Sequence, residues 1–128
     1  MFIGSNIWPK TNWKNKILFL ESSEDKPNPS FISQILRNPL MTEVLSQIKG
    51  LIIGKPVDET YYEEYKNLYL EVIQQELKLK ELFVGYNYNF GHTAPMCVLP
   101  IGIKVRISAE DGSIEFLESA TKEEKNGK

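Results

Sequence analysis

Lys16-Ile17-Leu18-Phe19-Leu20-Glu21 is the stretch of sequence that organises the fold. Four consecutive apolar residues with no polar residue between them are typical of a buried strand. Glu21 and the turn-forming residues 22–29 end this run. Two later runs, Leu51-Ile52-Ile53-Gly54 and Leu82-Phe83-Val84-Gly85-Tyr86, have a similar character. We therefore predict three strands, of which the first two are buried.

The segments between these runs carry helical signals. Asn28 before Pro29 is typical of an N-cap with proline in the first turn, and apolar residues then recur at helical spacing as far as Asn38-Pro39. We expect Thr42 to cap a second short helix and Gly50 to end it in a left-handed conformation.

The longest helical pattern runs from Tyr61 to about Lys80, where apolar residues recur at steps of three and four. The tyrosines of this pattern, which we interpret as core residues or contacts to another subunit, are Tyr61, Tyr62, Tyr65 and Tyr69. Because strands and helices alternate, the strands are expected to form a parallel sheet with right-handed crossovers.

The rest of the chain predicts antiparallel strands. Short strands are expected at residues 96–99, 103–108 and 113–117. Asp111-Gly112 is a hairpin turn signal between the last two. The predicted fold class is α/β: a layered β/β/α domain over residues 1–121, with a small parallel core sheet plus antiparallel strands, similar to swivelling domains. Residues 122–128 are charged and are expected to form a disordered tail.

Composition and charge limit the function classes. Of the 128 residues, 41% are hydrophobic and 25% are charged, as in a globular domain. Lysine plus arginine is 15 against 17 for aspartate plus glutamate, so nucleic acid is not an expected partner. No apolar run approaches the roughly 18 residues of a membrane span, and the N-terminal residues lack an export-signal pattern. The single cysteine, Cys97, cannot form an internal disulfide, and this fits a cytoplasmic location.

Two residues that follow predicted strands could carry chemistry. Glu21 ends the first strand, and the single histidine, His92, lies in Asn89-Phe90-Gly91-His92-Thr93-Ala94-Pro95. Because loops after parallel strands meet at one edge of the sheet, the two side chains are expected to lie together. A carboxylate that accepts the imidazole N–H orients a general base, as in a catalytic triad. The alternative is that His92 is a hydrogen-bonded loop residue without a catalytic role and that Glu21 is simply the first solvent-exposed residue after the strand.

Other reactive residue types give weaker signals. Cys97 lies between Met96 and Val98 in an apolar run, so we expect a small buried core residue, although a Cys97–His92 dyad remains a rival. One histidine and one cysteine make no zinc ligand set, and neither a metal nor a cofactor is expected.

Four motifs occur in series along the chain. They are Ile17-Leu18-Phe19-Leu20-Glu21, Lys49-Gly50-Leu51-Ile52-Ile53-Gly54, Asn89-Phe90-Gly91-His92-Thr93-Ala94-Pro95 and Leu99-Pro100-Ile101-Gly102. In this order and spacing they resemble the C-terminal domain of the LD-carboxypeptidase family of serine peptidases, over about Gly4 to Leu117. Trp8-Pro9 and Ala94-Pro95-Met96 are more similar to the microcin C immunity branch than to the cell-wall peptidase branch.

The resemblance implies a Ser-His-Glu hydrolase in which Glu21 and His92 are the glutamate and the histidine. The family's serine lies in a separate N-terminal domain. Ser5 is no substitute, because residues 1–15 resemble the segment between the domains and no nucleophile elbow surrounds it. We therefore expect a truncated C-terminal domain that is inactive alone and whose partner is the missing N-terminal domain. The implied substrates are small cell-wall peptides or peptidyl-nucleotides, and the intact protein is expected to be a homodimer.

A hypothesis from another class is a non-catalytic binding or dimerisation module. In that case His92 is structural, and the tyrosine-bearing helix contacts a partner. A strand, a tight glycine–serine turn and a helix encoded upstream would favour the hydrolase over the module.

Overall fold

The computed structural model describes residues 12–121. The chain divides into two compact units, Met1–Met96 and Cys97–Lys128. Ser5, Trp8-Pro9 and the predicted tail at 122–128 lie outside the described residues. The predicted domain limits therefore stay predictions. Between residues 12 and 121, no helix is long and apolar enough to cross a membrane.

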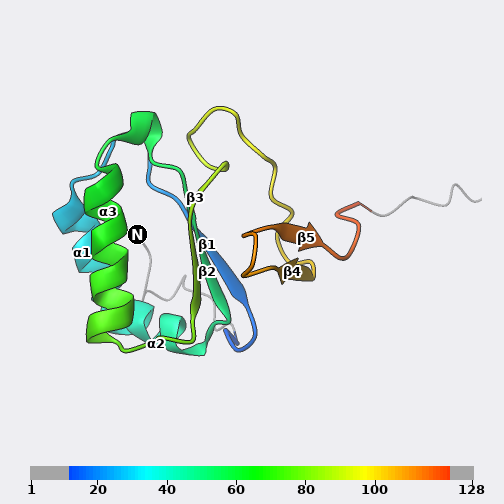
Figure 1. Cartoon of the computed structure of the whole chain (residues 1–128), viewed down its shortest axis with the longest axis horizontal. Coiled ribbons are helices and arrows are strands. Elements are labelled where there is room, and N and C mark those ends of the chain that lie inside the picture. The colour runs from blue at the N-terminus through cyan, green and yellow to red at the C-terminus, as the bar shows by residue number, and fades with distance from the viewer. Residues whose placement is uncertain (1–11, 122–128) are drawn as a thin grey trace, which may run out of the picture. The chain divides into compact units, whose positions relative to one another are not determined.

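The first unit is built on a three-stranded sheet in the order β1-β2-β3 (Figure 1). The strands are β1 (Ile17–Leu20), β2 (Gly50–Gly54) and β3 (Phe83–Tyr88). Both pairs are parallel, so that prediction is confirmed. The central strand β2 is buried along its whole length. Every residue of the edge strand β1 keeps partial exposure, so the prediction of a buried first strand is wrong.

Two short helices follow β1: α1 (Pro29–Leu36) and α2 (Pro39–Gln47). Asn28 caps α1 as predicted, because its side chain accepts a backbone N–H of the first turn. The prediction for the second cap is wrong, since Asn38 and not Thr42 caps α2 in the same way. Gly50 is the first residue of β2 rather than the left-handed end of a helix.

The long helix is shorter and less regular than predicted. It consists of α3 (Tyr62–Leu70) and η2 (Glu71–Glu76), and a separate turn, η1 (Val57–Glu59), precedes it. η1 is a single 3-10 turn, and η2 continues α3 in π-helical geometry. Lys78 has a left-handed backbone, with φ 56°, so the helix ends near Leu77 and does not reach Lys80.

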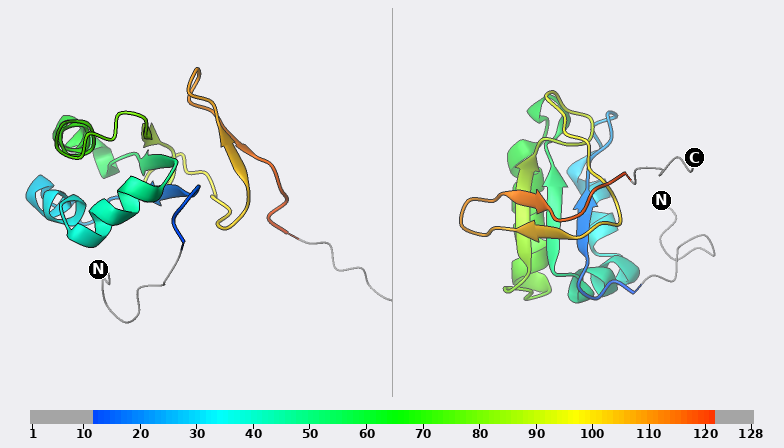
Figure 2. Two further views of the ribbon diagram at one scale, coloured as in Figure 1. Left: turned by 90° about the horizontal axis from the view of Figure 1, so that it is seen from below. Right: turned by 90° about the vertical axis from the view of Figure 1, so that its right-hand side faces the viewer.

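The helices of the first unit cover one face of its sheet (Figure 1; Figure 2). Alternate side chains of a strand point to opposite faces. The strand residues that pack into the helix-side core are Leu18, Leu20, Leu51, Ile53, Val84 and Tyr86. The predicted apolar face of the long helix contributes Tyr65, Tyr69, Val72 and Ile73. Burial raises the pKa of Tyr69 above its ordinary value.

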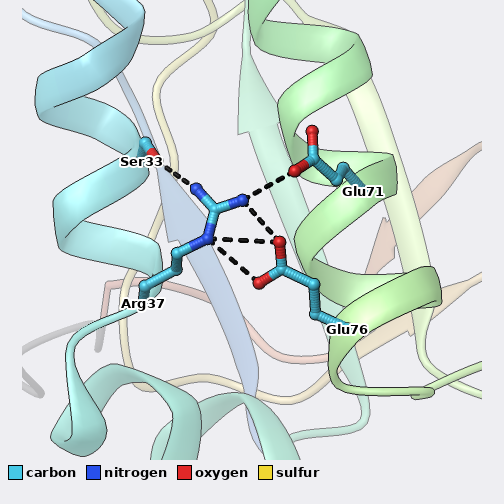
Figure 3. A network of polar contacts seen from close by, with 4 residues as sticks. All are labelled: Ser33, Arg37, Glu71 and Glu76. Atoms are coloured by element: carbon cyan, nitrogen blue, oxygen red, sulfur yellow. Dashed lines mark hydrogen bonds and ion pairs between the residues drawn. The ribbon is translucent and has the colours of Figure 1, made fainter.

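A polar network ties α1 to the α3–η2 segment (Figure 3). Arg37, which ends α1, donates from Nε to Glu76 at 3.0 Å and from Nη2 to Glu71 at 2.8 Å, and it also contacts Ser33. The hydrogen bond from Arg37 lowers the pKa of the Glu76 carboxyl. Because Glu71 and Glu76 lie at the two ends of the π-helical turn, the guanidinium holds that turn against α1.

The second unit contains an antiparallel pair, β4 (Val105–Ile107) and β5 (Ile114–Phe116), as predicted. The backbone N–H of Ser113 donates to Asp111 at 3.0 Å and lowers the pKa of that carboxyl to about 2. The prediction of a strand at residues 96–99 is wrong, and Cys97 is exposed rather than buried. An apolar run becomes a strand only where a neighbouring strand supplies hydrogen bonds. Within residues 12–121, no strand pairs with residues 96–99.

Candidate active site

Glu21 and His92 lie side by side at the carboxyl-terminal edge of the parallel sheet. Glu21 is the first residue after β1, and His92 lies in the loop after β3. His92 Nδ1 is 3.5 Å from Glu21 Oε2, and the two side chains are 46% and 44% exposed. This distance exceeds the roughly 2.7–2.9 Å of a charge-assisted hydrogen bond. Catalytic hydrogen bonds of this kind often shorten when a substrate binds. With Nδ1 facing the carboxylate, Nε2 is the nitrogen left to exchange a proton.

A β-bulge at the end of β3 sets the face on which the following loop lies. Ile52 pairs with Gly85, but Gly54 pairs with Tyr88, so β3 uses one residue more than β2 over this stretch. Asn87, within the bulge, has φ 71°. One extra residue reverses the face of every later side chain. The chain after the bulge is therefore directed to the face of the sheet opposite the helices.

Phe90 fastens the histidine loop to this opposite face. It is 7% exposed, and its ring meets Phe19 edge-on with the ring centroids 5.5 Å apart. Gly54 makes room for the loop, because a Cβ there would lie 2.9 Å from the carbonyl oxygen of Phe90. Phe19 and Glu21 are two residues apart, as are Phe90 and His92. The Phe19–Phe90 contact and the Glu21–His92 contact are therefore separated by two residues on each of the two segments, which is the spacing of side chains on one face of an extended chain.

An open cavity of about 850 Å³ adjoins His92. Lys55, which directly follows β2, supplies a cation to its lining and is 27% exposed. The Lys55 ammonium lies 3.2 Å from the Glu59 carboxylate, which also lines the cavity. The site thus combines an imidazole with a partly neutralised, half-buried cation.

The loops after β1 and β2 are joined beside this cavity. Lys26 Nζ forms an ion pair with Asp58 Oδ2 at 2.6 Å. Lys26, Asp58 and Glu59 all have left-handed backbones, which cost on the order of 1–2 kcal/mol each for residues other than glycine. Such residues persist where the surroundings fix them, and they cluster at functional sites. The wall formed by Asp58 and Glu59 is therefore held in one strained conformation.

Glu21 and His92 were predictable from the sequence, whereas Lys55, Asn87 and Phe90, which also build the site, were not predicted. Lys55 could have been found, since a polar residue directly after a buried strand satisfies the rule that selected Glu21. Asn87 and Phe90 gave no such signal, because a bulge depends on the pairing of two strands.

Cys97 and a metal ligand set were the other chemical groups considered for this chain. Cys97 is exposed and begins the second unit, and the Cys97–His92 dyad stays a prediction. Over the described part of the chain, no group of three histidine, cysteine or acidic residues could hold a metal ion.

This geometry defines a class of protein: an α/β domain whose polar residues gather at the carboxyl edge of a parallel sheet. The family model described as the LD-carboxypeptidase C-terminal domain matches residues 1–107, and the chain belongs to that family. The resemblance read from the four motifs is thereby confirmed.

Two longer relatives share this domain. A putative carboxypeptidase of Treponema pallidum (strain Nichols) is 25% identical over 97 residues, which cover 76% of this chain and 28% of that protein. The crystal structure of an MccF-like protein from Streptococcus pneumoniae in complex with AMP is similar, with 35% identity and a TM-score of 0.71. That match covers 81% of this chain and 29% of the MccF-like chain. The chain thus spans less than a third of the length of these relatives.

Proposed function

We propose that this chain supplies the orienting acid and the general base of a serine hydrolase whose serine belongs to another domain. The observation that carries the proposal is the 3.5 Å approach of Glu21 Oε2 to His92 Nδ1. Membership of the LD-carboxypeptidase family supports the same reaction class.

In the proposed mechanism, His92 Nε2 removes the serine proton as the serine oxygen bonds to the substrate carbonyl carbon. The imidazolium then protonates the leaving nitrogen as the C–N bond breaks. Water attacks the acyl-serine by the same route and regenerates the serine hydroxyl. Glu21 accepts the Nδ1–H throughout, which orients the ring and stabilises its positive charge. Without the serine domain the chain is expected to hydrolyse nothing.

The cavity beside His92 is the proposed substrate site. One relative is a carboxypeptidase by name, and carboxypeptidases act on chains that end in a carboxylate. The other was crystallised with AMP, which carries an anionic phosphate. The ammonium of Lys55 would pair with an anion of either kind. We infer a small peptide or a peptidyl-nucleotide as the substrate.

A chimera tests the proposal, because activity requires the serine domain. The corresponding part of the MccF-like protein is replaced by this chain. Hydrolysis is then measured on a small peptide with a free terminal carboxylate and on an aminoacyl nucleotide whose acyl group is joined to the nucleotide part through an amide nitrogen, so that a C–N bond breaks in both. Cleavage of either is expected, and His92→Ala should lower kcat by about 10^4-fold, the scale of losing a triad member. Lys55→Met should raise KM and leave kcat nearly unchanged, because it removes binding rather than chemistry.

Lys80→Met is the matched control for Lys55→Met, since Lys80 is exposed and does not line this cavity. Equal KM values in the two variants would remove Lys55 from substrate binding. A folded chimera that cleaves neither substrate, or that is unaffected by His92→Ala, contradicts the hydrolase and favours the binding module.

Two partners belong to the proposal. One is the N-terminal serine domain, and the other is a second copy of the intact protein. Analytical ultracentrifugation of the chimera is expected to give twice the mass of one chain. A monomer that is fully active would exclude dimerisation from the mechanism.

A further inference from the structure

The backbone next to His92 lies directly against the Glu21 side chain. A Cβ added at Gly91 would overlap Glu21 Oε2 and would lie 3.0 Å from the Glu21 Cβ and Cδ atoms. Gly91 also has φ 85°, a conformation that residues with a side chain rarely adopt. The space that Glu21 occupies thus exists only because residue 91 has no side chain.

The site contains a second close approach with a different consequence. At Gly54 an added Cβ would meet the backbone of Phe90, so a substitution there would displace the loop. At Gly91 the atom that overlaps is Oε2, at the far end of the half-exposed Glu21 side chain, while the Glu21 Cβ and Cδ atoms lie at the limit of close contact. A residue larger than glycine at position 91 would therefore push the carboxylate into solvent and leave the loop in place.

We propose that Gly91 is a positioning residue, which admits the Glu21 carboxylate beneath the backbone of the histidine loop and thereby sets the acid–histidine contact. The bulge at Asn87 and the buried ring of Phe90 bring the loop to β1, and Gly91 sets the last step of approach. Its effect on the contact follows from the geometry, and its effect on hydrolysis rests on the proposed function.

The test follows the tautomer of the neutral imidazole by long-range 1H–15N NMR of the full chain at alkaline pH. His92 is the single histidine, so the signals need no assignment. A carboxylate facing Nδ1 holds the proton on that nitrogen, whereas imidazole in water favours the proton on Nε2. Gly91→Ala is expected to lower the ratio of the Nδ1–H to the Nε2–H form about tenfold, the scale of losing a hydrogen bond to a charged group.

Gly102→Ala is the matched control for backbone strain. Gly102 has φ 89°, and an added Cβ there meets no atom of residues 12–121 within 4 Å. This variant should keep the wild-type ratio. In a Glu21→Ala background, Gly91→Ala should change the ratio no further. If Gly91→Ala fails to fold, Gly91→Asn serves, because asparagine tolerates a left-handed backbone better than alanine.

An unchanged tautomer ratio in folded Gly91→Ala or Gly91→Asn would overturn the proposal, whatever the activity. In the chimera, Gly91→Ala is expected to lower kcat with little change in KM. A changed ratio with unchanged kcat would uphold the positioning role and contradict the proposed function.

Discussion

Removing the ring of Phe90 should detach the histidine loop from the sheet and destabilise the first unit. A buried aromatic side chain removes about 150–250 Å² from water, which at about 25 cal/mol per Å² corresponds to roughly 4–6 kcal/mol as an upper bound. Phenylalanine-to-alanine changes in protein cores cost about 3–5 kcal/mol. Because Phe90 is only 7% exposed, we expect Phe90→Ala to lower the free energy of unfolding by about 3–4 kcal/mol.

Urea unfolding followed by far-ultraviolet circular dichroism measures this change, because every described helix lies in the first unit. With a slope of about 1–3 kcal/mol per molar urea, the midpoint should fall by at least about 1 M. Phe90→Leu keeps most of the apolar area and loses the ring pair with Phe19, so it should cost only about 1 kcal/mol.

Phe31→Ala is the control for the same chemical change at a half-exposed position. Phe31 is 51% exposed, so its loss should be no more than about half that of Phe90→Ala. A Phe90→Ala protein within about 0.5 kcal/mol of wild type would refute the reasoning, because the ring could not then be what holds the histidine loop in place.

Three smaller predictions concern capping and titration. Asn38→Ala should lower the free energy of unfolding by about 1 kcal/mol and Thr42→Ala by less than half of that, measured by urea unfolding; equal losses would contradict the observed cap. Burial raises the pKa of Tyr69, so stability should hold below about pH 10 and fall above it, and Tyr69→Phe should flatten that fall in urea midpoints taken across this range. The pKa of Asp111 is lowered to about 2, so the contribution of its contact with Ser113 is present above about pH 4 and is lost as the pH falls toward 2. The chemical shift of the Ser113 amide should titrate with a midpoint near 2, and a midpoint near 4 would contradict this hydrogen bond.

The parallel sheet was predictable because its signals are local. Each strand is a short apolar run with a turn or a helix signal beside it, and alternation of the two restricts the topology. The cap at Asn28 was predictable for the same reason. Asn38-Pro39 carries the same signal as Asn28-Pro29, so the second cap could have been found by applying one rule twice.

The errors concern properties that depend on distant partners. Residues 96–99 have the composition of a buried strand, yet Val98 is 86% exposed, since a strand needs a neighbour to pair with and a buried side chain needs others to pack against. The long helix ends just after a π-helical turn, at the left-handed backbone of Lys78, and Arg37 contacts that turn from the end of another helix. At the site, the positions of Glu21 and His92 after strands are a local signal. The bulge at Asn87, which directs the loop to the face opposite the helices, is a property of the pairing between β2 and β3.

The most direct test of the proposed function asks whether His92 activates a serine supplied by another domain. This test requires no knowledge of the substrate. A fluorophosphonate probe is reacted with the chimera, and the rate of serine labelling is compared between the wild-type chain and His92→Ala. General-base assistance predicts a rate about 10^2- to 10^4-fold slower in the variant. Equal labelling rates in the two folded proteins would contradict the central claim that this domain provides the base.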